Sequence, residues 1–149
     1  MSNQERLRVY TDGGCSPNPG PGGWAVVAEE DGRLQVVVSG TEADTTNNRM
    51  EITAALAALR KYAGRPICLS TDSQYLRDGI CTWIKNWKRN GWRTSRREAV
   101  KNSDLWRRLD ELAAGADVQW VWVRGHTGNP GNEMADQAVG RARSEAFGS

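Results

Sequence analysis

Apolar and polar residues alternate at the start of the chain. In LRVYTD, residues 7–12, Leu7 and Val9 alternate with Arg8 and Tyr10, and this period of two predicts a β-strand. The run stops at Asp12, which two glycines follow. Asp-Gly is ordinary turn chemistry, so this acid taken alone predicts only that the chain turns after the strand.

Two further apolar runs follow a stretch rich in glycine and proline at 13–23, which predicts a loop. The segment WAVVAEEDGRLQVVVSG, residues 24–40, has apolar residues on both sides of Asp31-Gly32. Asp-Gly between two such runs is a strong hairpin signal. The opening region therefore predicts three antiparallel strands.

The pattern then changes to helical spacing. Apolar residues recur every three or four positions from about 48 to 63, before a glycine and a proline that end the predicted helix. ICLSTD, residues 67–72, and VQWVWV, residues 118–123, predict two more strands, with helical spacing between them and after them. Strands joined by helical crossovers pair in parallel, so we expect a mixed sheet flanked by helices.

Length and composition narrow the class of protein. The 149 residues, 38% of them hydrophobic, predict a single domain over 1–149 with a core that needs no disulfides. The N-terminus has no apolar signal region and no run approaches the roughly 18 apolar residues of a membrane span, so a cytoplasmic location and no membrane partner are expected. Three scattered cysteines predict reduced, mostly buried thiols. Nothing indicates an obligate protein partner, so a monomer is expected.

Two predicted strands end on acids, Asp12 and Asp72. In sheets flanked by helices, ligands gather at the carboxyl ends of the strands. If the two strands are parallel neighbours, their carboxylates lie side by side and repel each other unless a cation lies between them. Asp72 has an alternative interpretation as the cap of a helix that follows it.

Two more acids fit the same edge. Glu51 shares a face of the first predicted helix with Ala55 and Leu59, so it leans toward the sheet, although Asn48 and Glu51 could instead form a capping box. Asp136 lies near the start of the last predicted helix, where an acid is also favoured by the helix dipole. Four acids at one sheet edge favour the interpretation as a metal site.

The ligand type selects the ion and the reaction. Carboxylates without histidine or cysteine pairs favour Mg²⁺ or Mn²⁺ over Zn²⁺. Two such ions form a clamp for in-line phosphoryl displacement, which is nuclease chemistry. The only histidine, His126, lies in a glycine-rich loop before the helix of Asp136; it is either polar surface or a group that exchanges a proton with water or the leaving oxygen.

The segment from Lys85 to Arg108 concentrates positive charge. It holds nine basic and two acidic residues, a local charge of +7, whereas the rest of the chain carries −5. Trp83 and Trp87 lie among these bases on a predicted helix that should end at Asn90-Gly91, and burial in the core is the alternative explanation for them. We expect a protruding basic arm at about 83–102, in which residues such as Lys88 and Arg89 bind a nucleic-acid backbone.

Six segments in order resemble the cellular, bacterial-like type 1 ribonuclease H family across nearly the whole chain: YTDGGCSPNPGPGGWA, TTNNRMEITAALAAL, STDSQYLRDGI, WIKNWKRNGWRT, VKNSDLWRRLD and WVRGHTGNPGNEMAD. The resemblance implies an α/β fold with a five-stranded mixed sheet, three antiparallel strands then two parallel, and helices on both faces. It implies endonucleolytic hydrolysis of the RNA strand of RNA:DNA hybrids with Mg²⁺, leaving 5′-phosphate and 3′-hydroxyl ends.

The resemblance also assigns residues by motif. Asp12, Glu51, Asp72 and Asp136 correspond to the family's metal-binding carboxylates, and His126 to its proton-handling histidine. The minor-groove readers it implies are Asn18, Asn47, Asn48 and Gln74. Thr46 and Asn102 correspond to a pocket for a DNA-strand phosphate, and Trp83 and Trp87 to the aromatic face of the DNA channel.

Two alternatives stay open at this point. A related metal nuclease, an exonuclease or a resolving enzyme, could use the same acids at the same sheet edge. A non-catalytic nucleic-acid-binding module could use the basic arm alone. Gly131 departs from the common family pattern, in which a larger residue stands there, so we expect a looser loop at His126 and a turnover rate that departs from the family's.

Overall fold

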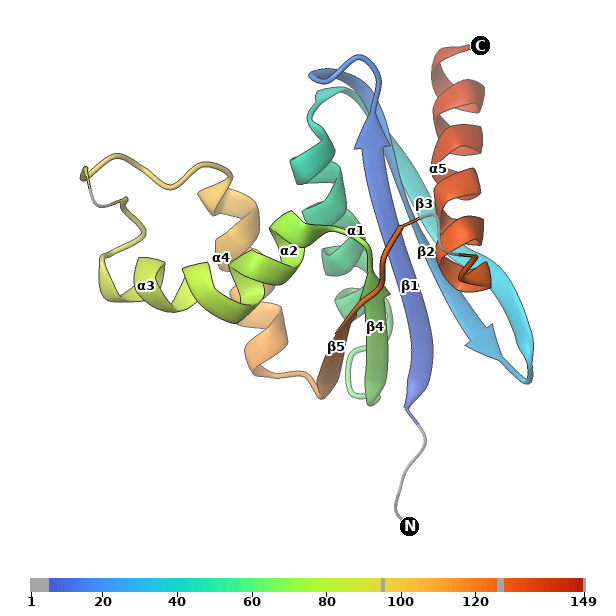
Figure 1. Cartoon of the computed structure of the whole chain (residues 1–149), viewed down its shortest axis with the longest axis horizontal. Helices are drawn as coiled ribbons and strands as arrows, with labels where there is room; N and C mark the ends of the chain where they lie inside the picture. The colour runs from blue at the N-terminus through green and yellow to red at the C-terminus, as the bar shows by residue number, and fades with distance from the viewer. Residues whose placement is uncertain (1–5, 95, 126–127, 149) are drawn as a thin grey trace.

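The structure is a computed structural model that describes residues 6–94, 96–125 and 128–148 (Figure 1). Within these residues the elements are, in chain order, β1 (Leu7–Cys15), β2 (Gly20–Glu30), β3 (Arg33–Thr45), α1 (Asn47–Lys61), β4 (Ile67–Thr71), α2 (Gln74–Asp78), the π-helical turn η1 (Gly79–Trp83), α3 (Ile84–Arg89), α4 (Ser103–Ala114), β5 (Val118–Trp122) and α5 (Pro130–Phe147). None of the helices in these ranges is long and apolar enough to cross a membrane.

The described strands form one five-stranded sheet in the order β3-β2-β1-β4-β5. β1, β2 and β3 are antiparallel neighbours, whereas β4 pairs in parallel with both β1 and β5. Alternate residues of β2 face opposite sides: Val26 lies in the large core with α1, and Ala25 packs with Ala138 and Val139 of α5. Helices therefore cover both faces, and the predicted fold class is confirmed.

β1 does not end at Asp12, contrary to the prediction. It runs on to Cys15, and Asp12 pairs with Ala25 in the middle of the antiparallel ladder. The expected loop at 13–23 is correspondingly short, because only residues 16–19 separate β1 from β2. The pairing of β1 with β4 stops at the pair Tyr10–Ser70, because β4 ends at Thr71. Beyond this point β1 has no partner in β4, and this is where Asp12 lies.

Glycine at position 13 allows β1 to continue past the first turn of α1. A Cβ atom on Gly13 would lie 2.4 Å from the carbonyl carbon of Met50, a distance that no side chain tolerates. Glycine inside a strand often marks such a close approach of two backbones. The approach brings the first turns of α1 directly against the strand that carries Asp12.

α1 begins two residues before the position that the capping-box interpretation required. Thr46 is the N-cap, and its hydroxyl accepts a hydrogen bond from the Arg49 N–H at 3.2 Å. Asn48 is therefore a helical residue in the first turn, and Glu51 lies beyond the turn that a cap can reach. The capping-box interpretation of Asn48 and Glu51 is wrong, so helix capping does not explain the carboxylate of Glu51.

The chain from α2 to α4 extends away from the sheet, at the left in Figure 1. α3 ends at Arg89 with Asn90 as its C-cap, as the Asn-Gly pair predicted. Five aromatic rings with centroids 5.3–6.1 Å apart join this extension to α4: Tyr75, Trp83, Trp87, Trp92 and Trp106. Such pairs each stabilise by about 0.5–1.5 kcal/mol, so they hold the base of the extension against the core.

Two details of the sheet and the thiols complete the fold. β3 is an edge strand, and the register shifts between the pairs Val26–Val38 and Val27–Val36, which leaves Val37 as the extra residue of a β-bulge.

The three cysteines are free, as predicted, but they are not mostly buried: Cys15 and Cys68 are half-buried and Cys81 is exposed. Cys81 is exposed because the turn η1 has only Gly79 buried.

Candidate metal site and nucleic-acid interface

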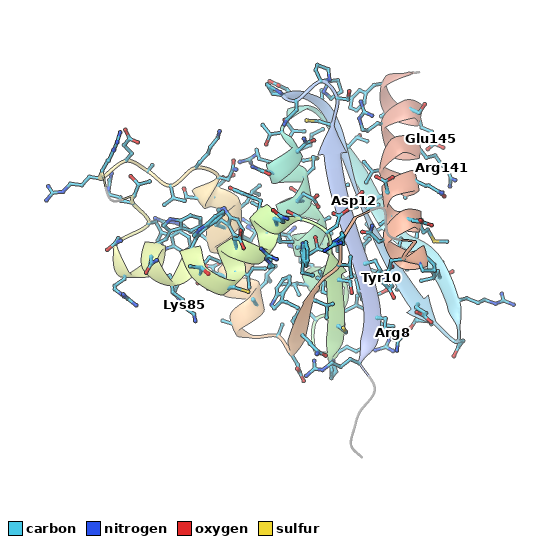
Figure 2. The ribbon with its side chains drawn as sticks, in the orientation of Figure 1. Arg8, Tyr10, Asp12, Lys85, Arg141 and Glu145 are labelled. Carbon is cyan, nitrogen blue, oxygen red and sulfur yellow. The ribbon has the colours of Figure 1, made fainter. Side chains whose placement is uncertain are left out.

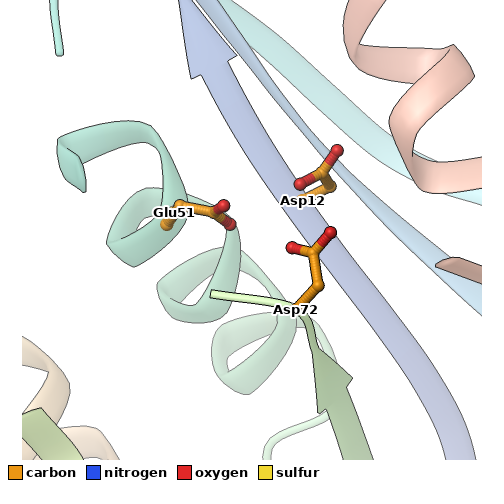
Figure 3. A group of neighbouring side chains, drawn as sticks. All are labelled: Asp12, Glu51 and Asp72. Carbon is orange, nitrogen blue, oxygen red and sulfur yellow. The ribbon is translucent and has the colours of Figure 1, made fainter. Parts of the chain in front are cut away.

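Three acidic side chains converge where β4 ends. Asp12 projects from the middle of β1, Glu51 from the second turn of α1, and Asp72 from the residue that follows β4 (Figure 3). Each offers a carboxylate oxygen, and these three oxygens lie within 4.8 Å of one another. Among the described residues, these three acids form the group whose spacing suits a metal ion.

Local structure turns Asp72 toward this group. The interpretation of Asp72 as a helix cap is wrong, because Ser73 caps α2: its hydroxyl accepts a hydrogen bond from the Leu76 N–H at 3.0 Å. Gly125, after β5, passes beside the carboxylate, and a Cβ atom there would lie 3.0 Å from Asp72 Oδ2. A larger residue at 125 would press on the carboxylate.

The site raises the pKa of Asp12. Asp12 is only 7% exposed, and burial is the largest cause of a pKa of about 8. The negative charges of Asp72 and Asp136 raise it further, whereas a hydrogen bond from the Gly13 N–H lowers it. The Asp12 carboxyl therefore keeps its proton at neutral pH unless a bound cation takes the place of that proton.

Glu51 shows the same effect more strongly. Burial raises its pKa well above the ordinary value, and the charges of Asp12 and Asp72 add to this. Its Oε1 is completely buried and has no hydrogen-bond partner among the residues that the structure describes. An orphaned carboxylate oxygen is costly in a folded protein, which indicates that a bound group normally satisfies it.

These donors fit a hard divalent cation. Carboxylate oxygens are the ligands that Mg²⁺ and Mn²⁺ prefer, and a cation would remove both the mutual repulsion and the unsatisfied oxygen of Glu51. Thiol and imidazole ligands, which Zn²⁺ prefers, are absent from the group of three. We name this group, together with Asp136, the carboxylate pocket.

Asp136 lies beside the group of three and outside it. It is an exposed residue of α5, two turns from the N-cap Asn129, too far along for the helix dipole to explain it. Its charge and a hydrogen bond that it shares with Asp12 both contribute to the raised pKa of Asp12. His126, the predicted proton-handling residue, lies outside the described residues.

Two of the four predicted minor-groove residues, Asn18 and Asn47, meet at the loop between β1 and β2. The Asn47 N–H donates to Asn18 Oδ1 at 3.1 Å, and the Cys15 N–H donates to Asn47 Oδ1 at 2.7 Å. Asn18, Asn47 and Asn48 are all exposed. Gln74 is exposed at the start of α2, two residues after Asp72. The structure thus brings Asn18 and Asn47 into contact and leaves all four amides accessible.

Thr46 and Asn102 are connected through a residue that the sequence did not single out. Arg49, one turn after the cap Thr46, donates to Asn102 Oδ1 at 3.1 Å and forms an ion pair with Asp104 at 2.9 Å. The Asn102 Nδ2 donates in turn to the Tyr75 hydroxyl at 3.1 Å. These bonds tie the start of α1 to the start of α4.

The basic arm, residues 83–102, combines half-buried aromatic rings with exposed bases. Trp83 and Trp87 are half-buried in the aromatic group, so burial accounts for part of each ring and the remainder faces solvent. Lys88 and Arg89 are exposed, and Lys88 pairs with Asp110 at 3.3 Å. Figure 2 shows Lys85 pointing away from the body of the molecule.

Arg49 and Gly13 are the clearest residues that sequence reasoning missed. The signal for Gly13 was present, because a glycine within an alternating strand pattern indicates a close backbone approach. Arg49 carried no such signal, since an arginine in the first turn of a helix is usually solvated and its partners Asn102 and Asp104 are 53 and 55 residues away.

Comparisons with known proteins agree with this site. The family model described as RNase H matches residues 4–144. A protein of Maricaulis maris called "Ribonuclease H" is 51% identical over 144 residues, covering 95% of this chain and 96% of the relative. One of Pseudomonas aeruginosa strain PAO1, called "Ribonuclease HI", is 50% identical over 148 residues, covering 97% and 98%.

Solved structures agree with the fold. The crystal structure of LC9-RNase H1, described as a type 1 RNase H with the type 2 active-site motif, has a TM-score of 0.77 at 30% identity and covers 97% of this chain and 75% of that one. A crystal structure of LC11-RNase H1 in complex with RNA/DNA hybrid has a TM-score of 0.70 at 20% identity, covering 95% and 99%. The prediction made from the motifs is confirmed, and the chain belongs to the ribonuclease H family.

Proposed function

We propose that this enzyme cuts the RNA strand of RNA:DNA hybrids internally, by hydrolysis that leaves 5′-phosphate and 3′-hydroxyl ends. The observation that carries the proposal is the convergence of Asp12, Glu51 and Asp72 at the end of β4, with oxygens within 4.8 Å of one another and a buried oxygen left unsatisfied. A membership of the ribonuclease H family supports the choice of substrate.

The carboxylate pocket would hold the cofactor, through Asp12, Glu51, Asp72 and Asp136. Two Mg²⁺ ions, which Mn²⁺ could replace, would supply positive charge at the attacking and leaving oxygens of an in-line phosphoryl displacement. Asp12 and Glu51 sit on rigid elements, a paired strand and a buried helix, so they would hold the cations in fixed positions. His126 would exchange a proton with water or with the leaving oxygen.

Substrate selection follows from the two sides of the site. Asn18, Asn47, Asn48 and Gln74 are exposed, and their amides can bond both 2′-hydroxyls and the degenerate base edges of the minor groove. Thr46 and Asn102 would bind a phosphate of the DNA strand, and Trp83, Trp87, Lys88 and Arg89 would follow its backbone. Base sequence should therefore matter little.

A panel of end-labelled duplexes tests the proposal. RNA:DNA hybrid, duplex RNA, duplex DNA and single-stranded RNA are each offered with Mg²⁺, and with EDTA as the control. We expect internal cuts in the RNA strand of the hybrid alone, and no cuts in EDTA. An RNA strand with a blocked 3′ end separates the alternatives, because an exonuclease requires a free end and an endonuclease does not. The predicted cytoplasmic location and monomeric state stay predictions.

A further inference from the structure

We propose that Arg143 of α5 is a positioning residue that holds the loop between β1 and β2, residues 16–19, in the conformation that presents Asn18 to the substrate. The inference rests on the proposed function, since it takes the hybrid as the ligand of this loop. Arg143 lies 125 residues from Asn18 in the sequence, and neither the motifs nor the metal site assigns it a role.

The guanidinium of Arg143 closes the two ends of the loop. Its Nη2 donates to the Ser16 carbonyl oxygen at 2.9 Å, and its Nε donates to the Pro21 carbonyl oxygen at 3.1 Å. The Ser16 N–H also donates to the Pro21 oxygen, at 3.2 Å. Hydrogen bonds from a charged donor are shorter and stronger than neutral ones, so this fork fixes the separation of the two strand ends.

The aliphatic part of the Arg143 side chain is also held in place, by packing against β2. α5 packs on β2 at Gly23, where an added Cβ atom would lie 3.0 Å from Arg143 Cγ and 3.3 Å from the Val139 carbonyl oxygen. The aliphatic stem therefore lies directly on the β2 backbone. Little rotamer freedom remains for the side chain, and the guanidinium points at the loop before any substrate binds.

The opposite side of the loop is bound to α1. Asn18 Oδ1 accepts from the Asn47 N–H at 3.1 Å and from the Cys15 thiol at 3.3 Å. Because this oxygen is engaged, the donor end of the Asn18 amide is the part available for acceptors of the substrate, such as 2′-hydroxyl oxygens or minor-groove base edges. The loop is therefore clamped from two helices, and Arg143 supplies the contact from α5.

α5 connects this clamp to the carboxylate pocket. Asp136 and Arg143 are seven residues apart, which places them two turns apart on one face of the helix. Arg141 is exposed, and Figure 2 shows it on the outer side of α5. It lines a hollow with Val36 and Ser39 of β3. It offers a control with the same charge on the same helix.

The test compares Arg143→Met, Arg143→Lys and Arg141→Met in the full chain. Methionine keeps an unbranched stem and removes the donors. For Arg143→Met we expect the amide exchange of Ser16 and Asn47, measured without substrate, to rise on the order of tenfold. KM for a labelled hybrid should rise about five- to tenfold while kcat changes by less than about twofold. Arg143→Lys should recover part of both effects, and Arg141→Met should show neither.

A second variant tests whether the two residues act through one loop. Asn18→Ala should raise KM in the native background and add little in the Arg143→Met background, because the clamp and the reader are coupled. Equal exchange and equal KM in Arg143→Met and Arg141→Met would overturn the inference, as would faster exchange with an unchanged KM or a loss in kcat alone. Failure of the native chain to cut hybrids would instead overturn the proposed function, whatever the exchange data show.

Discussion

The carboxylate pocket and the basic arm each gather charge of one sign, but they place it in opposite surroundings. Asp12 is 7% exposed and Glu51 has a fully buried oxygen, so when both are ionised their charges repel one another with little water between them. The bases of the arm, such as Lys85 and Arg89, are exposed. Burial, together with the charges of Asp72 and Asp136, raises the pKa of Asp12 to about 8, whereas water and salt screen the charges of the arm.

The difference teaches how each region can bind its ligand. Buried like charges form a site that is incomplete until a cation occupies it, so each carboxylate is required and the loss of one is severe. Solvated like charges act as a sum, because each base neutralises a phosphate largely independently of the others. Substitutions should therefore act as all-or-none changes in the pocket and as graded changes in the arm.

The largest expected effect is that of Asp72→Asn. The amide is nearly the same size but lacks the charge that holds a cation, so we expect kcat on hybrid to fall by at least about 1,000-fold. The Kd for hybrid, measured by anisotropy in Ca²⁺ or EDTA, should change by less than about threefold. Glu145→Gln, an exposed acid on α5, is the control and should leave both values unchanged. Retained Mg²⁺-dependent cleavage by Asp72→Asn would contradict the metal site.

A smaller, graded effect is expected in the arm. Replacing Lys88, Arg89 and Arg93 by Gln should weaken hybrid binding about tenfold near 0.1 M salt and reduce the slope of log K against log salt by about two to three units. The measurement is a salt titration of binding. Replacing the exposed bases Arg33, Arg60 and Lys61 by Gln removes the same charge outside the arm. If both triple variants change the slope equally, the arm has no special role.

The smallest effect concerns the ion pair between Arg49 and Asp104, which joins the start of α1 to the start of α4. The Arg49 guanidinium lowers the pKa of Asp104. At any pH above the ordinary pKa of an aspartate, the ionised Asp104 therefore stabilises the folded state in full. This contribution is lost as the pH falls through the lowered pKa. Because the Asp104 side chain is 64% exposed, Asp104→Asn should cost less than about 1 kcal/mol at pH 7. Urea unfolding at pH 7 and near pH 2 measures this, and a difference that persists at the lower pH would argue against the ion pair as its cause.

The sequence predicted the elements well because each has a local cause. Alternation predicted β1, the two apolar runs around Asp31-Gly32 predicted β2, β3 and their turn, and helical spacing predicted α1. Asp12 and Asp72 could be predicted as neighbours because their strands, β1 and β4, pair in parallel, and the structure brings them together with Glu51 of α1. Family motifs supplied the residue roles that spacing could not.

The errors arose where distant parts of the chain decide the local structure. β1 continues past Asp12 because it keeps a partner in β2, and the edge at the site exists because β4 stops. The error in the cap of α1, by contrast, was local: the Thr46 hydroxyl, two residues before Asn48, accepts the hydrogen bond from the Arg49 N–H. Arg49 and Arg143 find their partners across more than 50 residues, and no local pattern records such contacts.

The bulge at Val37 also governs how copies of the chain meet one another. β3 is thirteen residues long and lies at the sheet margin, where a straight strand would offer its unpaired peptide groups to a neighbouring molecule. The extra residue bends this margin, and charged side chains such as Arg33 and Glu42 flank it. Fibril formation and strand exchange are thereby discouraged, so the same irregularity that interrupts the ladder helps to keep concentrated enzyme in solution.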